Sequence, residues 1–253
     1  MTFMRDTWIV FTRALRISVR NPVWLILGLL QPILYLALFG PLLERVSSVQ
    51  GFGQGDAWQV FVPGLLIALA MFGSAFAGFG LVAEWRAGVI ERMRVTPASR
   101  ASLLVGRILR DVVVLFVQGL LLIVAAAGFG LRVPLMAVVV GLLLVAGLGS
   151  ALAALSYAAA LVLKSEDALA PLVNGLALPL MLLAGIFLPM TMAPRWLQVL
   201  SDFNPLKHIV DGVRAMFQGD LGASVALQGI AWTLGLLAIG VFVGTRTFQR
   251  ENA

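Results

Sequence analysis

The chain contains no cysteine, a single histidine and few charged residues, which make up only 12% of its 253 residues. The absence of cysteine excludes disulfides, thiolate metal sites, iron–sulfur clusters and a cysteine nucleophile. Because a soluble domain is typically about 25% charged, this chain cannot cover a globular surface with polar groups. We therefore exclude an ordinary soluble enzyme, a disordered chain and a nucleic-acid-binding domain.

Hydrophobic residues make up 60% of the chain, and their distribution indicates a membrane protein. Six uncharged runs of 20 to 31 residues alternate with charged segments. A membrane helix needs about 20 mostly apolar residues, and a helix satisfies its own backbone polar groups in lipid. We predict an all-α integral membrane protein with six transmembrane helices in a single domain, residues 1–253. The predicted spans are approximately 23–43, 58–83, 111–130, 134–163, 169–190 and 227–246.

The basic residues predict how the spans are oriented. With six spans both termini lie on one side, and that side holds thirteen of the 18 basic residues. The excess of positive charge on cytoplasmic loops then places both termini in the cytoplasm. The net charge of +6 therefore has a cause in membrane topology and does not indicate a nucleic-acid partner.

The cores of the six predicted spans carry no Asp, Glu, Lys, Arg or His. Ionisable groups within a membrane mark proton relays and ion pathways, so their absence argues against a proton-coupled carrier, an ion pump and a membrane metalloprotease. Isolated polar residues in the spans either form hydrogen bonds between helices or line a weakly polar translocation path. The candidates for such a path are Gln31, Ser74, Gln118 and Asn174.

Two segments outside the spans are amphipathic. Residues 1–22 interleave arginines with apolar residues, which is typical of a helix lying in the membrane interface, and they lack the pattern of a cleavable signal peptide. Residues 191–226 combine apolar and polar residues on the predicted external side, and we expect short helices at, or dipping into, the interface. There, Asp211 and Arg214 are three residues apart and could pair on one helix face. In the fifth span, Pro171, Pro179 and Pro189 predict a kink or a break.

The loop after the second span, residues 84–100, has the most informative pattern. Val89, Ile90 and Met93 form a short apolar stripe among charged residues. Thr96 followed by Pro97 is typical of an N-cap and the first position of a new helix. A compact helix with an apolar stripe suits a groove on another protein. The alternative is a basic loop that only fixes the topology.

These features resemble the permeases of the ABC-2-type transporter family, and in particular the multidrug export and antibiotic resistance permeases of the daunorubicin-resistance type. The resemblance lies in the loop residues Glu84, Gly88, Glu91, Thr96-Pro97, Ser99-Arg100 and Gly106-Arg107, and in the later residues Phe203-Asn204-Pro205-Leu206, Asp211-Gly212-Val213-Arg214 and Gly219. The six-span pattern with an amphipathic N-terminal helix also fits, so the resemblance covers essentially the whole chain.

The resemblance implies a division of labour between this chain and its partners. A separate ATPase subunit, in two copies, would supply the energy, and a second permease subunit, identical or paralogous, would complete the path in the bacterial cell membrane. A cytoplasmic coupling helix in 84–100 would contact the ATPase, with a smaller contact at the turn after the fourth span. The coupling residues would be Glu84, Arg86, Gly88, Val89, Ile90, Glu91, Met93, Thr96, Pro97, Arg100, Lys164, Glu166 and Asp167. The external re-entrant gate would include Asn204, Pro205, Asp211 and Arg214.

The sequence supports one part of this scheme independently. A phosphate-binding P-loop needs a lysine after glycine, whereas the chain's two lysines, Lys164 and Lys207, follow leucine. We therefore expect no nucleotide, metal or catalytic site in this chain, with ATP and magnesium held by the partner. The cargo stays open between a hydrophobic or amphiphilic drug, antibiotic or lipid and a lipid-linked polysaccharide or wall polymer. A secondary carrier or a membrane-embedded enzyme is the alternative from another class.

Overall fold

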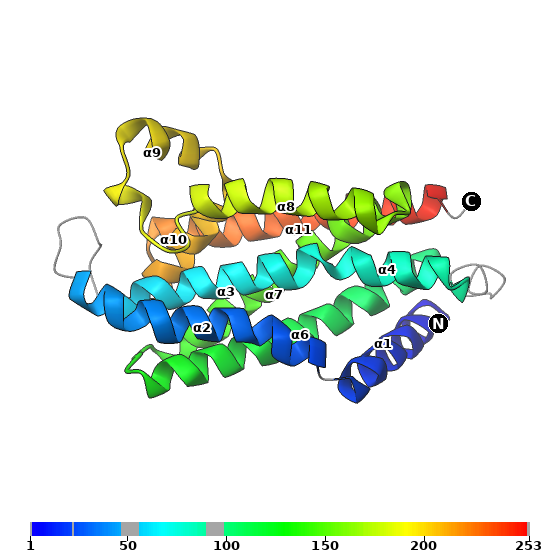
Figure 1. Ribbon diagram of the computed structural model, residues 1–253, viewed down its shortest axis with the longest axis horizontal. Coiled ribbons are helices and arrows are strands. Elements are labelled where there is room, and N and C mark those ends of the chain that lie inside the picture. The colour runs from blue at the N-terminus through cyan, green and yellow to red at the C-terminus, as the bar shows by residue number, and fades with distance from the viewer. Residues whose placement is uncertain (1, 22, 47–55, 90–98, 252–253) are drawn as a thin grey trace.

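The computed structural model describes residues 2–21, 23–46, 56–89 and 99–251. Within these ranges every regular element is a helix, and the helices run roughly side by side along one long axis (Figure 1). Their bounds are α1 (Thr2–Arg20), α2 (Val23–Val46), α3 (Ala57–Ala75), α4 (Ala77–Arg86), α6 (Arg100–Gly128), α7 (Leu135–Leu163), α8 (Glu166–Leu183), the 3₁₀ turn η1 (Met190–Met192), α9 (Arg195–Asp202), α10 (Pro205–Phe217) and α11 (Ser224–Glu251).

Six segments of the described chain are long and apolar enough to cross a membrane, which confirms the predicted fold class. They are Leu25–Leu43, Ala57–Arg86, Ala101–Gly128, Leu135–Leu163, Glu166–Leu183 and Ser224–Arg250. The N-terminus and the C-terminal end of α11 lie at one end of this bundle, and α9 and α10 lie at the other (Figure 1). We refer to these as the predicted cytoplasmic end and the predicted external end.

The second membrane segment is broken at Phe76, where α3 gives way to α4. A break inside lipid leaves backbone groups that must find a partner within the protein. Ser156 of α7 supplies it: its hydroxyl accepts from the Gly78 amide at 2.9 Å and donates to the Ala75 carbonyl at 2.5 Å. This polar side chain of a span therefore serves as a bond between helices.

The fifth segment is shorter than the predicted span 169–190, because α8 ends at Leu183. Pro171 and Pro179 lie inside the helix without ending it, and the chain turns at Gly185, whose φ of +66° favours glycine. The turn presses the Ile186 carbonyl against α3 so closely that a Cβ on Gly64 would meet its oxygen at 2.0 Å. Gly64 is thus the residue that lets α3 and the turn pack together.

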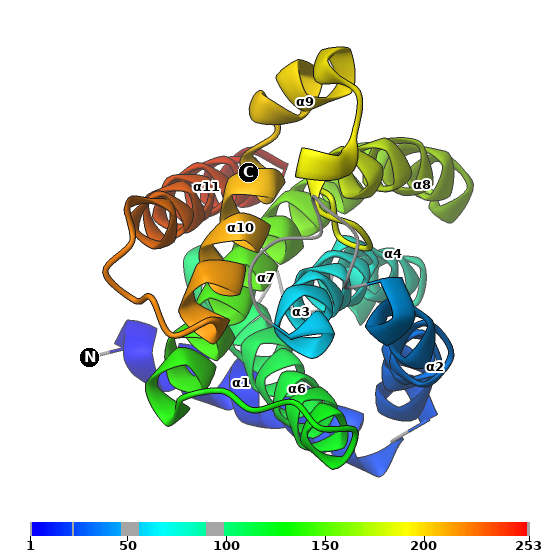
Figure 2. The same ribbon diagram turned by 90° about the vertical axis from the view of Figure 1, so that its left-hand side faces the viewer.

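Helix α7 is the central element, surrounded by α3, α6, α10 and α11 when the bundle is viewed from the predicted external end (Figure 2). Small residues permit these close contacts. A Cβ on Gly240 of α11 would meet the Ala151 carbonyl oxygen at 2.6 Å, and one on Gly147 would meet Thr233 at 2.9 Å. The glycines of α7 therefore pack within the chain rather than being left free for a second copy.

Candidate functional site

The predicted ATPase-coupling residues gather at the predicted cytoplasmic end, as far as the structure describes them. Glu84 and Arg86 end α4, and Gly88 and Val89 follow it. Arg100 is the first residue of α6. The remaining coupling residues of this loop, Ile90, Glu91, Met93, Thr96 and Pro97, lie outside the described residues.

Helix α6 has an N-terminal cap that the sequence interpretation did not identify. Ser99 precedes the helix in extended conformation, and its side chain accepts a hydrogen bond from the Ser102 amide at 3.2 Å. Such a cap satisfies one of the free amides of the first turn. The third apolar helix therefore starts well before residue 111, where the predicted span begins.

Two ion pairs tie the end of α4 to other helices. Glu84 accepts a hydrogen bond from the guanidinium of Arg107 on α6. Arg86 lies 3.6 Å from the carboxylate of Glu166, in the first turn of α8. The structure thus joins the two predicted ATPase contacts, the loop after the second span and the turn after the fourth.

The turn after the fourth span is tight. Lys164 ends α7 in the left-handed conformation with a φ of 51°, and Ser165 leads directly into α8. Glu166 and Asp167 occupy the first turn of that helix, where negative charge interacts favourably with the helix dipole. Glu166 is therefore held by the helix end as well as by Arg86.

A buried charged cluster that the sequence interpretation missed lies beside these pairs. We define the cytoplasmic-end cluster as Glu84, Arg107, Arg110, Asp111 and Tyr157. The Tyr157 hydroxyl of α7 donates to the Asp111 carboxylate at 2.5 Å, and Arg110 lies 3.1 Å from the same carboxylate. Arg107, Asp111 and Tyr157 are all buried. The cluster links α4, α6 and α7 through side-chain charges.

This cluster lies at the N-terminal end of the third apolar helix, and the expectation of span cores without charged residues stays a prediction. The predicted third span began at Asp111, but the apolar helix includes residues from Ala101 onward and so takes in Arg107 and Arg110. Two sequence signals pointed to the cluster. Arg107 and Asp111 are one helical turn apart, and Tyr157 is, with Ser150 and Ser156, one of three polar side chains in α7.

At the predicted external end, Arg214 of α10 is buried and binds mainly to backbone. Its guanidinium donates to the carbonyls of Val60 at 2.9 Å and Gly185 at 2.6 Å, and more weakly to Ile186 at 3.4 Å. It also pairs with Asp211 at 3.3 Å. The predicted pairing of Asp211 with Arg214 is therefore present, and the buried guanidinium of Arg214 anchors α10 to α3 and to the turn after α8.

Asn204 makes a second anchor next to this one. Its side chain caps α10 by accepting from the Leu206 amide at 3.0 Å, and it donates to the Leu180 carbonyl of α8 at 2.7 Å. Pro205 occupies the first helical position, where its missing amide costs nothing. Asn204 thus holds α10 against α8, and Arg214 holds it against α3 and the turn after α8.

Burial also perturbs the titration of this set. Desolvation raises the pKa of Asp211 above its ordinary value, with the attraction of Arg214 acting in the opposite direction. Burial likewise lowers the pKa of Arg214. On the exposed side, a hydrogen bond from Lys207 lowers the pKa of Asp202.

The four candidate path residues do not share one environment. Gln31 of α2 and Asn174 of α8 are exposed, and each bonds within its own helix, to Tyr35 at 3.0 Å and to the Ala170 carbonyl at 3.0 Å. Ser74 and Gln118 are buried, and Gln118 donates to the Leu25 carbonyl of α2 at 3.0 Å. A role in translocation stays a prediction for all four.

Among the described residues, no group of three or more His, Asp or Glu side chains could hold a metal ion. The arrangements at both ends of the bundle are instead hydrogen bonds and ion pairs that join helices. Such contacts can transmit or resist a displacement of one helix relative to another.

Comparison with known proteins relates this architecture to membrane transport. Residues 5–217 match the family described as ABC-2 type transporter. A daunorubicin resistance ABC transporter permease protein from Streptomyces coeruleorubidus is 25% identical over 95% of this chain and 85% of its own length. A permease from Mycobacterium tuberculosis named for doxorubicin resistance is 24% identical over 94% of the chain and 86% of its own length. A chain named as a transport permease in Cyanophora paradoxa is 27% identical over 85% and 75%.

Proposed function

The chain belongs to the ABC-2 type transporter family, and from that premise we propose that it is the permease subunit of an ATP-binding-cassette exporter. It forms the path for a hydrophobic or amphiphilic substrate such as a drug, an antibiotic or a lipid. A separate ATPase subunit, in two copies, binds ATP and magnesium and drives the transport. The relatives named for daunorubicin and doxorubicin resistance support this class of substrate.

The observation that carries the proposal is the Arg86–Glu166 ion pair, 3.6 Å long. It connects the end of α4, where the predicted coupling loop begins, with the start of α8, where the second predicted ATPase contact lies. The two contacts are far apart in the sequence, and this pair brings them together at one end of the bundle. In our proposal that surface receives the ATPase.

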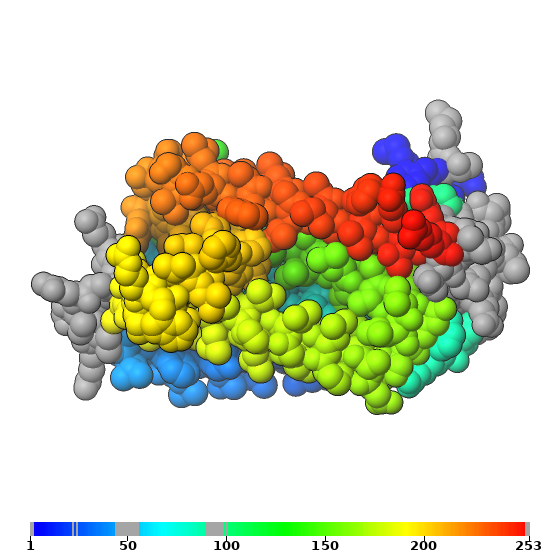
Figure 3. Space-filling view, turned by 90° about the horizontal axis from the view of Figure 1, so that it is seen from above, coloured from blue at the N-terminus to red at the C-terminus, as the bar shows by residue number. Residues whose placement is uncertain are grey.

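The contacts around this pair give a route for movement. A push on the loop displaces the end of α4, and the Glu84–Arg107 pair passes the displacement to α6. The Arg86–Glu166 pair passes it to α8. Because α8 and α11 lie along one face with a hollow between them (Figure 3), a shift of α8 changes the shape of that face.

The assembly that we propose contains a second permease subunit, identical or paralogous, in a bacterial cell membrane with both termini in the cytoplasm. Helices α2 and α8 expose apolar side chains such as Leu34, Leu38, Leu176 and Leu182. These faces meet lipid or the second permease.

Charge reversal at the ion pair tests the coupling. The single changes Arg86→Glu and Glu166→Arg place like charges together, and the double change restores an ion pair in the opposite sense. After co-reconstitution with the ATPase, we expect each single variant to lower ATP-driven export of a fluorescent anthracycline about tenfold, an effect of about 1.4 kcal/mol. The double variant should recover most of the export.

The matched control is the Lys207–Asp202 pair at the predicted external end. The changes Lys207→Glu and Asp202→Lys should each leave ATP-driven export by the reconstituted transporter unchanged. If the ATPase does not co-purify with the wild-type chain, or if all Arg86 and Glu166 variants export as the wild type does, the proposed function is wrong.

A further inference from the structure

Helix α1 has three faces with different chemistry. One face packs on α6, where Thr7 is buried and the Val10 side chain lies so close that a Cβ on Gly106 would meet it at 2.7 Å. A second face exposes the apolar side chains of Met4, Trp8 and Val19. At 100° per residue, the arginines fall on the remaining side of the helix. Among the described elements α1 packs mainly on α6, and it presents an apolar face next to a basic one.

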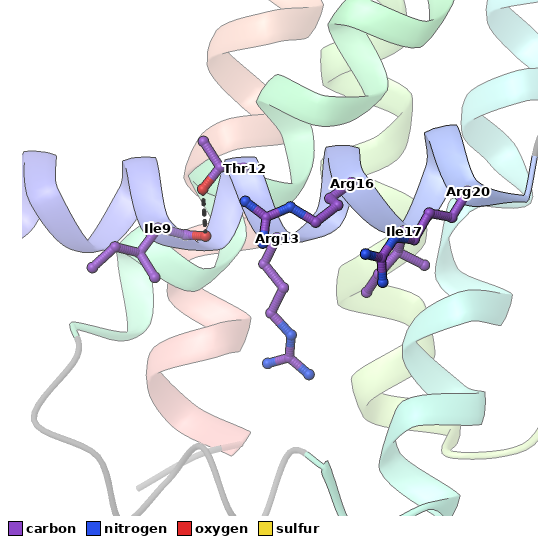
Figure 4. A pocket seen from close by; sticks show the side chains of 6 residues that line it. All are labelled: Ile9, Thr12, Arg13, Arg16, Ile17 and Arg20. Carbon is purple, nitrogen blue, oxygen red and sulfur yellow. Dashed lines mark hydrogen bonds between the residues drawn. The ribbon is translucent and has the colours of Figure 1, made fainter.

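The basic face contains a pocket. It has a volume of about 330 Å³, and it is lined by Ile9, Thr12, Arg13, Arg16, Ile17 and Arg20. Figure 4 shows the three arginine side chains around this pocket, with Arg13 extending away from the helix. The Thr12 hydroxyl donates its proton to the Trp8 carbonyl at 2.8 Å, so the guanidinium groups supply the donors for an anion.

The three arginines have no ion-pair partner in the part of the chain that the structure describes. Three acidic residues at this end pair with other arginines: Glu84 with Arg107, Glu166 with Arg86, and Asp111 with Arg110. Three like charges within a few turns repel one another. Such a group is stabilised by an anion that each guanidinium can contact, and phosphate oxygens match the guanidinium fork.

We propose that the Arg13–Arg16–Arg20 pocket binds the phosphate of an anionic phospholipid in the leaflet at this end of the bundle. The proposal needs only that the chain spans a membrane, and it does not depend on the coupling to an ATPase. The phospholipid bound in this pocket is not the transported substrate.

The neighbouring apolar face decides between a lipid and another anion. Trp8 and Val19 are 63% and 66% exposed, and on a helix lying in the interface this apolar face meets acyl chains, which puts the neighbouring arginines at the level of the headgroups. A phospholipid supplies both chemistries at once, because its headgroup meets the arginines while its acyl chains cover the apolar face. Ile9 and Ile17 line the pocket beside the arginines.

Native mass spectrometry of the purified chain in detergent tests the site. The probes are phosphatidylglycerol, phosphatidylcholine and inorganic phosphate. Each arginine near a membrane surface contributes about 1 kcal/mol of attraction to anionic lipid, or roughly fivefold in affinity. We therefore expect the double change Arg13→Gln with Arg16→Gln to weaken phosphatidylglycerol binding on the order of 30-fold. Phosphatidylcholine binding should not change.

The matched control removes the same charge at the same end. Arg246 and Arg250 are exposed on α11 outside the pocket, so Arg246→Gln with Arg250→Gln should leave phosphatidylglycerol binding within about twofold. The changes Arg13→Lys and Arg16→Lys keep the charge and should retain most of the affinity. Thermal unfolding in phosphatidylcholine should give the same midpoint for all variants, which excludes misfolding as the cause.

Four outcomes would overturn the proposal. The first is equal weakening in the control variant, and the second is equal binding of phosphatidylcholine. The third is full displacement of phosphatidylglycerol by inorganic phosphate at equal concentration, which would assign the pocket to a soluble anion. The fourth is unchanged lipid binding together with loss of ATPase co-purification, which would assign the arginines to an acidic protein surface.

Discussion

The two ends of the bundle hold their helices together in different ways. At the predicted cytoplasmic end, charged side chains bind other charged side chains: Glu84 to Arg107, and Arg110 to Asp111. At the predicted external end, Arg214 binds three backbone carbonyls as well as Asp211. Side-chain pairs can exchange partners when a helix moves, whereas carbonyls are fixed by the backbone. The difference indicates that the helices at the external end resist rearrangement, whereas the helices at the cytoplasmic end can shift relative to one another.

The strongest test of this comparison removes Arg214, the side chain that anchors α10 at the external end. Arg214→Ala leaves the carbonyls of Val60 and Gly185 buried without this donor, so we expect a loss of about 3–5 kcal/mol in the free energy of unfolding. Arg214→Lys keeps the charge but loses the planar fork of the guanidinium. Its free energy of unfolding should therefore fall between those of the wild type and Arg214→Ala. Thermal unfolding in detergent measures both changes. The control is Arg195→Ala, an exposed arginine at the same end, and an equal effect there would contradict the comparison.

A second test probes the cytoplasmic-end cluster. Tyr157→Phe removes the hydroxyl that donates to Asp111 at 2.5 Å, and a hydrogen bond to a charged group contributes about 1.5–3 kcal/mol. We expect a loss of unfolding free energy in that range, below the Arg214→Ala effect. Tyr35→Phe is the matched control, because among the described residues the Tyr35 hydroxyl accepts its hydrogen bond from the neutral Gln31 amide. Equal losses in the two variants would show that the charge of Asp111 adds nothing.

The smallest expected effect is a pH dependence at the external end. Burial raises the folded-state pKa of Asp211, so the folded chain binds this proton more tightly than the unfolded chain does. The resulting stabilisation is complete below the unfolded pKa of about 3.9 and is lost as pH rises through the folded pKa. The unfolding midpoint of the wild type, relative to Asp211→Asn, should therefore rise as the solution is acidified.

Asp202 provides the opposite sign at the same end. The hydrogen bond from Lys207 lowers its folded-state pKa, so its contribution is present above the unfolded pKa and is lost as pH falls. The wild type should lose any advantage over Asp202→Asn on acidification. If both differences move in the same direction with pH, the contrast between a buried and an exposed carboxylate is wrong.

The sequence predicted the membrane helices well because the signal is local. An uncharged apolar run long enough to cross a bilayer is a property of consecutive residues, and six such runs became six membrane helices. The ends were less accurate. The third helix begins earlier at the Ser99 cap, and the fifth ends earlier at the turn around Gly185. Both boundaries depend on contacts that a hydropathy count does not contain.

The candidate sites were predicted only where the signal is local in the sequence. The Asp211–Arg214 pair follows from a spacing of three on one helix, and it is present. The Glu84–Arg107 and Tyr157–Asp111 contacts join residues 23 and 46 positions apart, and no periodicity relates them. The coupling role of 84–100 stays a prediction, and part of that loop lies outside the described residues.

By itself the sequence determined that this chain lives in a bilayer, how many times it crosses, and where its basic residues gather, because transfer into hydrocarbon acts on each segment separately. Only the tertiary structure decided which charges are buried and what they bind. A buried guanidinium is tolerable only where specific partners surround it, and those partners come from helices that the chain brings together after the spans have formed.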